Sequence, residues 1–107
     1  MTTTTPQIRP GMTVFSVIEA VSAVTGVSPA EITGPRRTNR ICFARFLTMA
    51  GVRIAFPWWA LIDVSQAVGR GDHATIYHGL CRYRTLFDTD KHFRNAALTL
   101  GLPQIIP

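Results

Sequence analysis

Residues 69–84, G-R-G-D-H-A-T-I-Y-H-G-L-C-R-Y-R, decide the fold of this chain. The stretch opens with a glycine-rich turn, and Asp72 follows at a position that suits a helix N-cap. Beyond it, apolar residues recur at helical spacing at Ile76, Leu80 and Tyr83. The first turn of this helix carries small and polar residues that point away from the apolar stripe. A glycine-bearing turn followed by such a helix is typical of a helix-turn-helix DNA reader.

Working outward, the remaining sequence predicts an all-α domain of five to six helices and no strand. Start and stop signals predict a helix from Thr13 to about Thr25, a short turn after Ser28, a long helix from Thr38 or Asn39 to about Phe56, a helix over residues 57–68 and a last helix from Thr89 or Asp90 to about Leu100. We expect residues 1–11 to form a disordered arm, 12–101 the domain and 102–107 a tail. The apolar tail could pack back on the domain or continue into a longer protein.

Charge and composition narrow the function. The chain has 107 residues, enough for one domain, and a net charge of +5. Ten of its eleven cationic residues are arginine, the side chain that suits bidentate contacts with phosphate and guanine. No apolar run approaches a membrane span and no secretory signal pattern is present, so we expect a cytoplasmic, nucleoid-associated protein with no membrane partner. Cys42 and Cys81 are isolated, which favours neither a metal site nor a disulfide framework.

Several arginines are candidates for DNA contact. Arg36, Arg37 and Arg40 lie in one loop that either is a solvated charged segment or follows a DNA backbone or minor groove. Arg45 and Arg53 are eight residues apart on the long helix, which places them about 80° apart around its axis and predicts a shared exposed flank.

Trp58 and Trp59 are adjacent, so they cannot both face inward from one helix. At least one is expected to seal the edge of the core. The other either packs as well or is exposed as a contact surface.

The motif G-R-G-D-H-A-T-I-Y-H-G resembles the signature of the C-terminal DNA-binding domain of the bacterial replication initiator DnaA, roughly G-G-R-D-H-T-T-V-x-H-A. Upstream, R-R-T-N-R-I-C-F-A-R-F-L-T-M-A is similar to that family's basic loop and following helix, and V-S-P-A-E-I to the turn before the loop. Order and spacing agree from about residue 13 to residue 100. The resemblance implies a Trp-repressor-like helix-turn-helix and double-stranded DNA as the partner.

The same resemblance implies residue roles. It places Arg37 in the minor groove and Arg45 on a base in the major groove, with Arg53 on a phosphate. Base reading from the start of the recognition helix falls on Asp72, His73, Ala74 and Thr75.

Three departures from the family pattern bear on DNA preference. The turn reads G-R-G, which displaces Arg70 by one position. Ala74 replaces a threonine, so only its methyl group can meet a thymine methyl. Phe46 stands where the family has a glutamine. We therefore expect a target site that differs from the initiator's usual box.

The predicted function is sequence-specific binding of double-stranded DNA in the control of replication initiation or transcription, by a monomer. The gene for this chain could also come from a phage or a mobile element. No G-x-x-x-x-G-K-[ST] motif and no catalytic constellation are present, so we predict no cofactor and no enzyme activity. The alternative is an adapter that keeps the fold and binds a replication or transcription protein through the tryptophans and the apolar tail.

Overall fold

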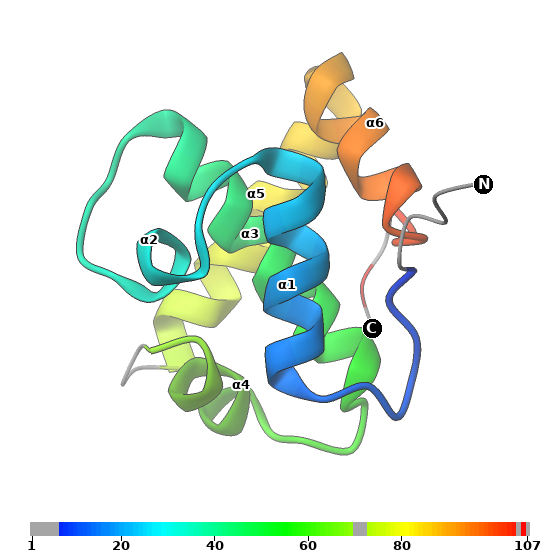
Figure 1. Ribbon diagram of the computed structural model, residues 1–107. Coiled ribbons are helices and arrows are strands. Elements are labelled where there is room, and N and C mark those ends of the chain that lie inside the picture. Colours follow the sequence, from blue (N-terminus) through cyan, green and yellow to red (C-terminus); the bar gives the residue numbers. More distant parts are fainter. Residues whose placement is uncertain (1–6, 70–72, 105, 107) are drawn as a thin grey trace, which may run out of the picture.

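The computed structural model describes residues 7–69, 73–104 and 106. This part of the chain forms six helices and no strand (Figure 1). The helices are α1 (Val14–Thr25), α2 (Pro29–Thr33), α3 (Asn39–Ala55), α4 (Leu61–Ala67), α5 (His73–Thr89) and α6 (Lys91–Thr99). The predicted all-α class with five to six helices is confirmed. The predicted reader helix is α5, which continues to Thr89.

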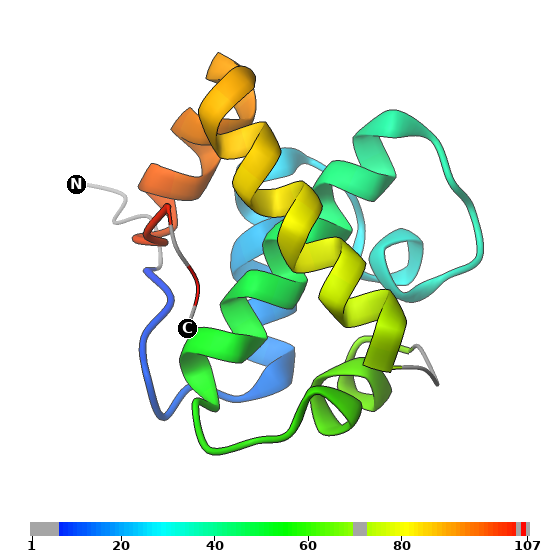
Figure 2. The same ribbon diagram turned by 180° about the vertical axis from the view of Figure 1, so that it is seen from behind.

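The long helix α3 is the centre of the fold. It packs against α1 on one side and against α5 on the other, as the two opposite views show (Figures 1 and 2). All five of its predicted inward-facing residues are buried: Ile41, Ala44, Leu47, Val52 and Ala55. They share one core cluster with Val17 and Val21 of α1 and Ile76 and Tyr83 of α5. One central helix therefore ties the N-terminal half of the domain to the helix-turn-helix half.

Gly79 of α5 lies where this helix crosses α3, against the side chain of Met49. A Cβ atom at Gly79 would lie 2.2 Å from the Sδ atom of Met49 on α3. Real Cβ atoms do not approach other atoms that closely, so a side chain at position 79 would require the flexible end of the Met49 side chain to move.

Helix ends follow the predicted capping signals. Thr13 accepts a hydrogen bond from the backbone N–H of Ser16 at 3.1 Å, and Asp90 accepts one from Phe93 at 2.9 Å. Ser28 and Glu31 form the expected reciprocal capping box at the start of α2. These bonds join residues three apart, so the sequence alone specifies them.

The helix expected over residues 57–68 is shorter than predicted, because α4 begins only at Leu61. The carboxylate of Asp63 accepts from the backbone N–H of Ala60 at 3.1 Å and so holds the start of α4 there. In the preceding turn, Trp59 is half-buried and stacks on Phe56 with ring centroids 4.0 Å apart, whereas Trp58 is 68% exposed. One tryptophan therefore seals the core and its neighbour faces solvent.

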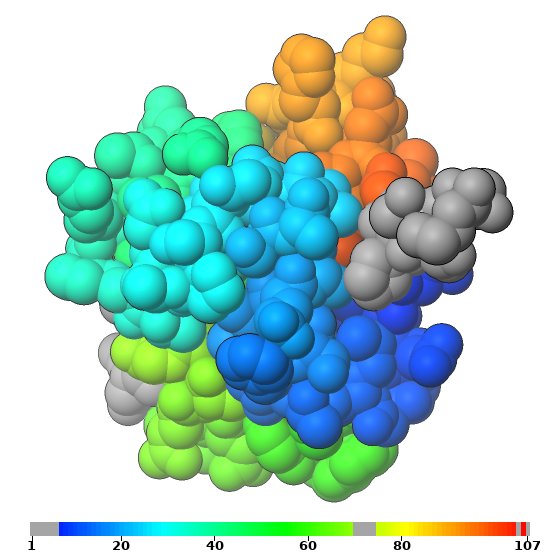
Figure 3. All heavy atoms as spheres, in the orientation of Figure 1, coloured from blue at the N-terminus to red at the C-terminus, as the bar shows by residue number. Residues whose placement is uncertain are grey.

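The segments that flank the helices belong to the core. Ile8 is buried and donates from its backbone N–H to the carbonyl of Leu100 at 2.8 Å, and the first described residues lie beside α1 (Figure 3). Residues 7–11, which belong to the arm expected to be disordered, contact the domain in this structure, and residues 1–6 lie outside the described part. At the other end, Leu102 is buried, and the Tyr83 hydroxyl donates to the carbonyl of Pro103 at 2.6 Å. Of the two fates considered for the tail, the described part packs back on the domain.

Candidate nucleic-acid interface

A groove of about 390 Å³ between α3 and α5 gathers cationic side chains from both sides. Its lining residues are Arg37, Cys42, Arg45, Phe46, Met49, Thr75, His78, Gly79 and Arg82. Three of them are arginines and none is acidic, so a phosphate backbone would meet only complementary charge there. The close helix crossing at Gly79 forms the floor of this groove.

The side of the groove formed by α5 carries Thr75, His78 and Arg82. Their spacing of three and then four residues places them on one face of the helix. Thr75 is half-buried, while His78 and Arg82 are exposed. The sequence reasoning singled out Thr75 but neither of the other two as a contact. Their spacing from Thr75 could have placed them on the same face of the helix, but only the position of α3 shows that this face lines a groove.

The turn before α5 lies partly outside the described residues. Arg70 and Asp72 belong to that part, as do the side chains of His73 and Ala74. The helix itself begins at His73, directly after the predicted N-cap position. Before the turn, Gly69 has a φ of 81°, the left-handed conformation that favours glycine. The predicted contacts at positions 70 and 72–74 stay predictions.

Arg45 does not lie on an exposed flank, which corrects the expectation that it shares one with Arg53. Its side chain is only 6% exposed. Nε donates to the carbonyl of Ile32 at 2.8 Å, and Nη2 donates to the carbonyls of Glu31 at 3.1 Å and Gly34. The guanidinium thus caps the C-terminal end of α2, where helix carbonyls lack intrahelical partners and attract a cation. Arg45 also lines the groove. Its predicted role in base reading stays a prediction.

The basic loop divides between two surfaces. Arg36 and Arg37 are exposed, and Arg37 lines the groove. Arg40 turns toward α1, where its Nη2 donates to the carbonyl of Gly26 at 2.8 Å. Hydrogen bonds from the Ser28 backbone and side chain lower the pKa of Glu31, and the charges of Arg40 and Arg36 lower it further. Arg40 lies in the first turn of α3 rather than in the expected loop, and of Arg36, Arg37 and Arg40 only Arg37 lines the groove.

Arg53 lies apart from the groove. It is half-buried, and its Nη1 donates to the carbonyl of Trp59. It borders a second hollow with Tyr77 and Arg84, which project from a different face of α5. Arg45 and Arg53 of α3 therefore have different surroundings: Arg45 lies beneath the groove, and Arg53 lies beside the turn that precedes α4.

The described residues contain no group of three or more histidine, cysteine, aspartate or glutamate side chains that could hold a metal ion. None of their helices is both long enough and apolar enough to cross a membrane.

Comparison with known proteins agrees with this geometry. The family model described as bacterial DnaA protein helix-turn-helix matches residues 14–82, which include α1 to α4 and the groove-forming part of α5. The chain is also 29% identical over 93 residues to the chromosomal replication initiator protein DnaA of Thermomicrobium roseum. That match covers 87% of this chain and 20% of the relative, so the chain spans about one fifth of the relative's length. No solved structure matches the chain significantly.

Proposed function

The chain belongs to the bacterial DnaA helix-turn-helix family, and from this premise we propose that it binds double-stranded DNA with sequence preference. The observation that carries the proposal is the groove between α3 and α5, which is lined by three arginines and no carboxylate. An α-helix fits the major groove of B-DNA, and cations beside it neutralise the flanking phosphates. Replication initiation is the setting that the relative's name suggests, and control of transcription is the other setting that we propose, with the protein acting as a cytoplasmic, nucleoid-associated monomer.

The proposal divides the contacts into two kinds. The start of α5, with Thr75 and the predicted residues Asp72 to Ala74, would read base edges. Arg37, just before α3, and Arg82, on α5, both line the groove and would hold phosphates. Base contacts set the preferred sequence, whereas phosphate contacts set affinity and its salt dependence.

Selection of bound sequences from a random duplex library tests this proposal. We expect enrichment of one asymmetric motif related to, but different from, the initiator's box. We also expect the logarithm of the association constant to fall linearly with the logarithm of salt concentration. No enriched motif together with an affinity that salt does not change would contradict the proposal.

A second function, a protein-interaction adapter, is favoured by the exposed Trp58. This indole is 68% exposed and lies at the turn before α4. Exposed aromatic residues are enriched in binding surfaces. The adapter would bind a replication or transcription protein, and it predicts that Trp58→Ala abolishes capture of that protein while DNA affinity is unchanged.

A further inference from the structure

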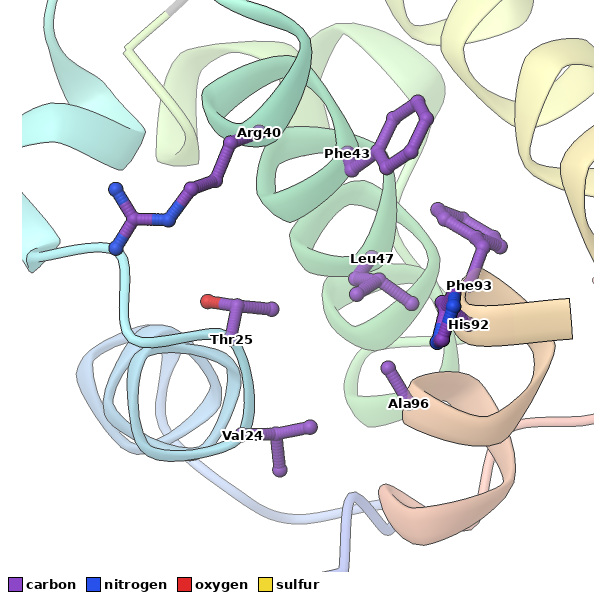
Figure 4. Close-up of a pocket in the computed structure, with 8 residues that line it drawn as sticks. All are labelled: Val24, Thr25, Arg40, Phe43, Leu47, His92, Phe93 and Ala96. Carbon is purple, nitrogen blue, oxygen red and sulfur yellow. The ribbon is translucent and has the colours of Figure 1, made fainter. Parts of the chain in front are cut away.

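An apolar pocket of about 360 Å³ lies where the end of α1, the start of α3 and α6 meet (Figure 4). It is separate from the groove between α3 and α5 and shares no lining residue with it. Its lining residues are Val24, Thr25, Arg40, Phe43, Leu47, His92, Phe93 and Ala96. Nothing in the proposed DNA contacts uses this pocket.

The inner surface of the pocket is apolar. Phe43 and Phe93 form an edge-to-face pair with ring centroids 5.6 Å apart and planes at 84°. Leu47 is buried and lies between Arg40 and His92 in the close-up view (Figure 4). Three secondary-structure elements supply this surface, so it is formed by the packed fold and needs no ligand to assemble.

The polar groups of the pocket have only one sign of charge. Arg40 stands at one end and His92 at the other, and no carboxylate lines the space between them (Figure 4). Arg40 uses Nη2 to donate to the carbonyl of Gly26. Its Nε and Nη1 atoms have no hydrogen-bond partner among the described residues and can donate to an acid group.

We propose that this pocket binds a small amphipathic anion, namely a carboxylate on an aromatic or branched aliphatic body. The carboxylate accepts from Arg40, and the apolar body covers Leu47 and the Phe43–Phe93 pair. A cavity of about 150 Å³ holds one benzene ring in another protein. A volume of about 360 Å³ therefore has room for a ring with a short acidic chain.

The test uses 4-phenylbutyrate as the probe and the full 107-residue chain, followed by amide chemical shifts in NMR. We expect saturable shifts that centre on Thr25, Phe43 and Ala96. The neutral 4-phenylbutanol should bind about five- to tenfold more weakly, because it lacks the charge-assisted bond to Arg40. Arg40→Gln should weaken 4-phenylbutyrate by a similar factor.

Two matched controls separate the pocket from general effects. Lys91→Gln removes the same charge from an exposed position next to His92 and should change affinity by about twofold or less. Ala96→Trp fills the pocket and should abolish binding, whereas Leu98→Trp, on the exposed face of α6, should not. Thermal unfolding of each variant confirms that it is folded.

Three outcomes would overturn the proposal. One is the absence of saturable shifts, and a second is equal affinity for the acid and the alcohol. The third is unchanged binding by folded Ala96→Trp. None of them depends on DNA, so the pocket and the proposed DNA-binding function stand or fall separately.

Discussion

The buried guanidinium of Arg45, a residue of α3, donates from Nε to the carbonyl oxygen of Ile32 at 2.8 Å and so joins α3 to the end of α2. The partners are thirteen residues apart in the chain. An arginine expected to read DNA is thus also a structural link beneath the groove.

Replacing Arg45 should therefore lower the stability of the fold, apart from any effect on DNA affinity. Arg45→Ala should lower the free energy of unfolding by about 2–3 kcal/mol, because it removes the donor to the carbonyl of the buried Ile32 and the bonds to the carbonyls of Glu31 and Gly34. Arg37→Ala, which removes an exposed arginine, should change it by no more than about 0.5 kcal/mol. Urea denaturation measures both. Unchanged stability of Arg45→Ala, with a loss of about 1–3 kcal/mol in DNA affinity, would leave base reading as its sole role.

A side chain at position 79 should displace the buried Met49 side chain. Gly79→Ala would stabilise an ordinary exposed helix by about 0.5–1 kcal/mol. Here we expect it to destabilise the fold by about 1–3 kcal/mol, because the new methyl group meets Met49. Calorimetry of Gly79→Ala with and without Met49→Ala completes a double-mutant cycle. We expect Gly79→Ala to lower the free energy of unfolding less when Met49 is already alanine. A stabilised Gly79→Ala variant would show that the crossing can relax.

Arg37 and Arg82 should act as phosphate contacts. Arg37→Gln and Arg82→Gln should each weaken all duplexes alike and reduce the slope of log affinity against log salt by about one. Arg9→Gln carries the same charge change on an exposed residue outside the groove, and should leave the slope nearly unchanged. Fluorescence anisotropy from low to moderate salt measures all three. Equal slopes for Arg82→Gln and the parent protein would remove Arg82 from the interface.

The two adjacent tryptophans should differ in their effect on stability. Trp59→Ala removes the ring stacked on Phe56 and should cost about 2–3 kcal/mol of unfolding free energy. Trp58→Ala should cost no more than about 1 kcal/mol, since that side chain is mostly in solvent. Iodide should quench the fluorescence of Trp59→Phe, which keeps Trp58, more strongly than that of Trp58→Phe. The reverse order would contradict the arrangement of this turn.

Acid should weaken the capping box of α2. The pKa of Glu31 is lowered in the folded protein, chiefly by its hydrogen bond with the Ser28 backbone. Its contribution to stability is therefore complete above the pKa of the unfolded chain and is lost as pH falls through the lower folded pKa. Glu31→Gln should flatten stability against pH in this acidic window while leaving the neutral-to-alkaline range parallel to the parent. Unfolding midpoints of both proteins, measured from pH 7 to about pH 3, test this prediction, and parallel curves over the whole range would contradict it.

The sequence by itself determined where most helices begin. Thr13, Ser28, Thr38 and Asp90 each bond to a backbone N–H three residues ahead, so the signal and its partner lie in one short window. The apolar spacing of α3 likewise identified its buried face before any neighbouring helix was known. Local hydrogen bonds and helical periodicity are properties of the chain itself.

Only the tertiary structure decided which arginines line the groove and which bond to other helices. Arg37, Arg40 and Arg45 lie within nine residues of sequence, yet one lines the groove, one bonds to the end of α1 and one is also buried against the end of α2. The reason is physical: a long cationic side chain donates to whichever carbonyls the packed helices place within reach. For Arg40 and Arg45 those partners are eleven to fourteen residues away.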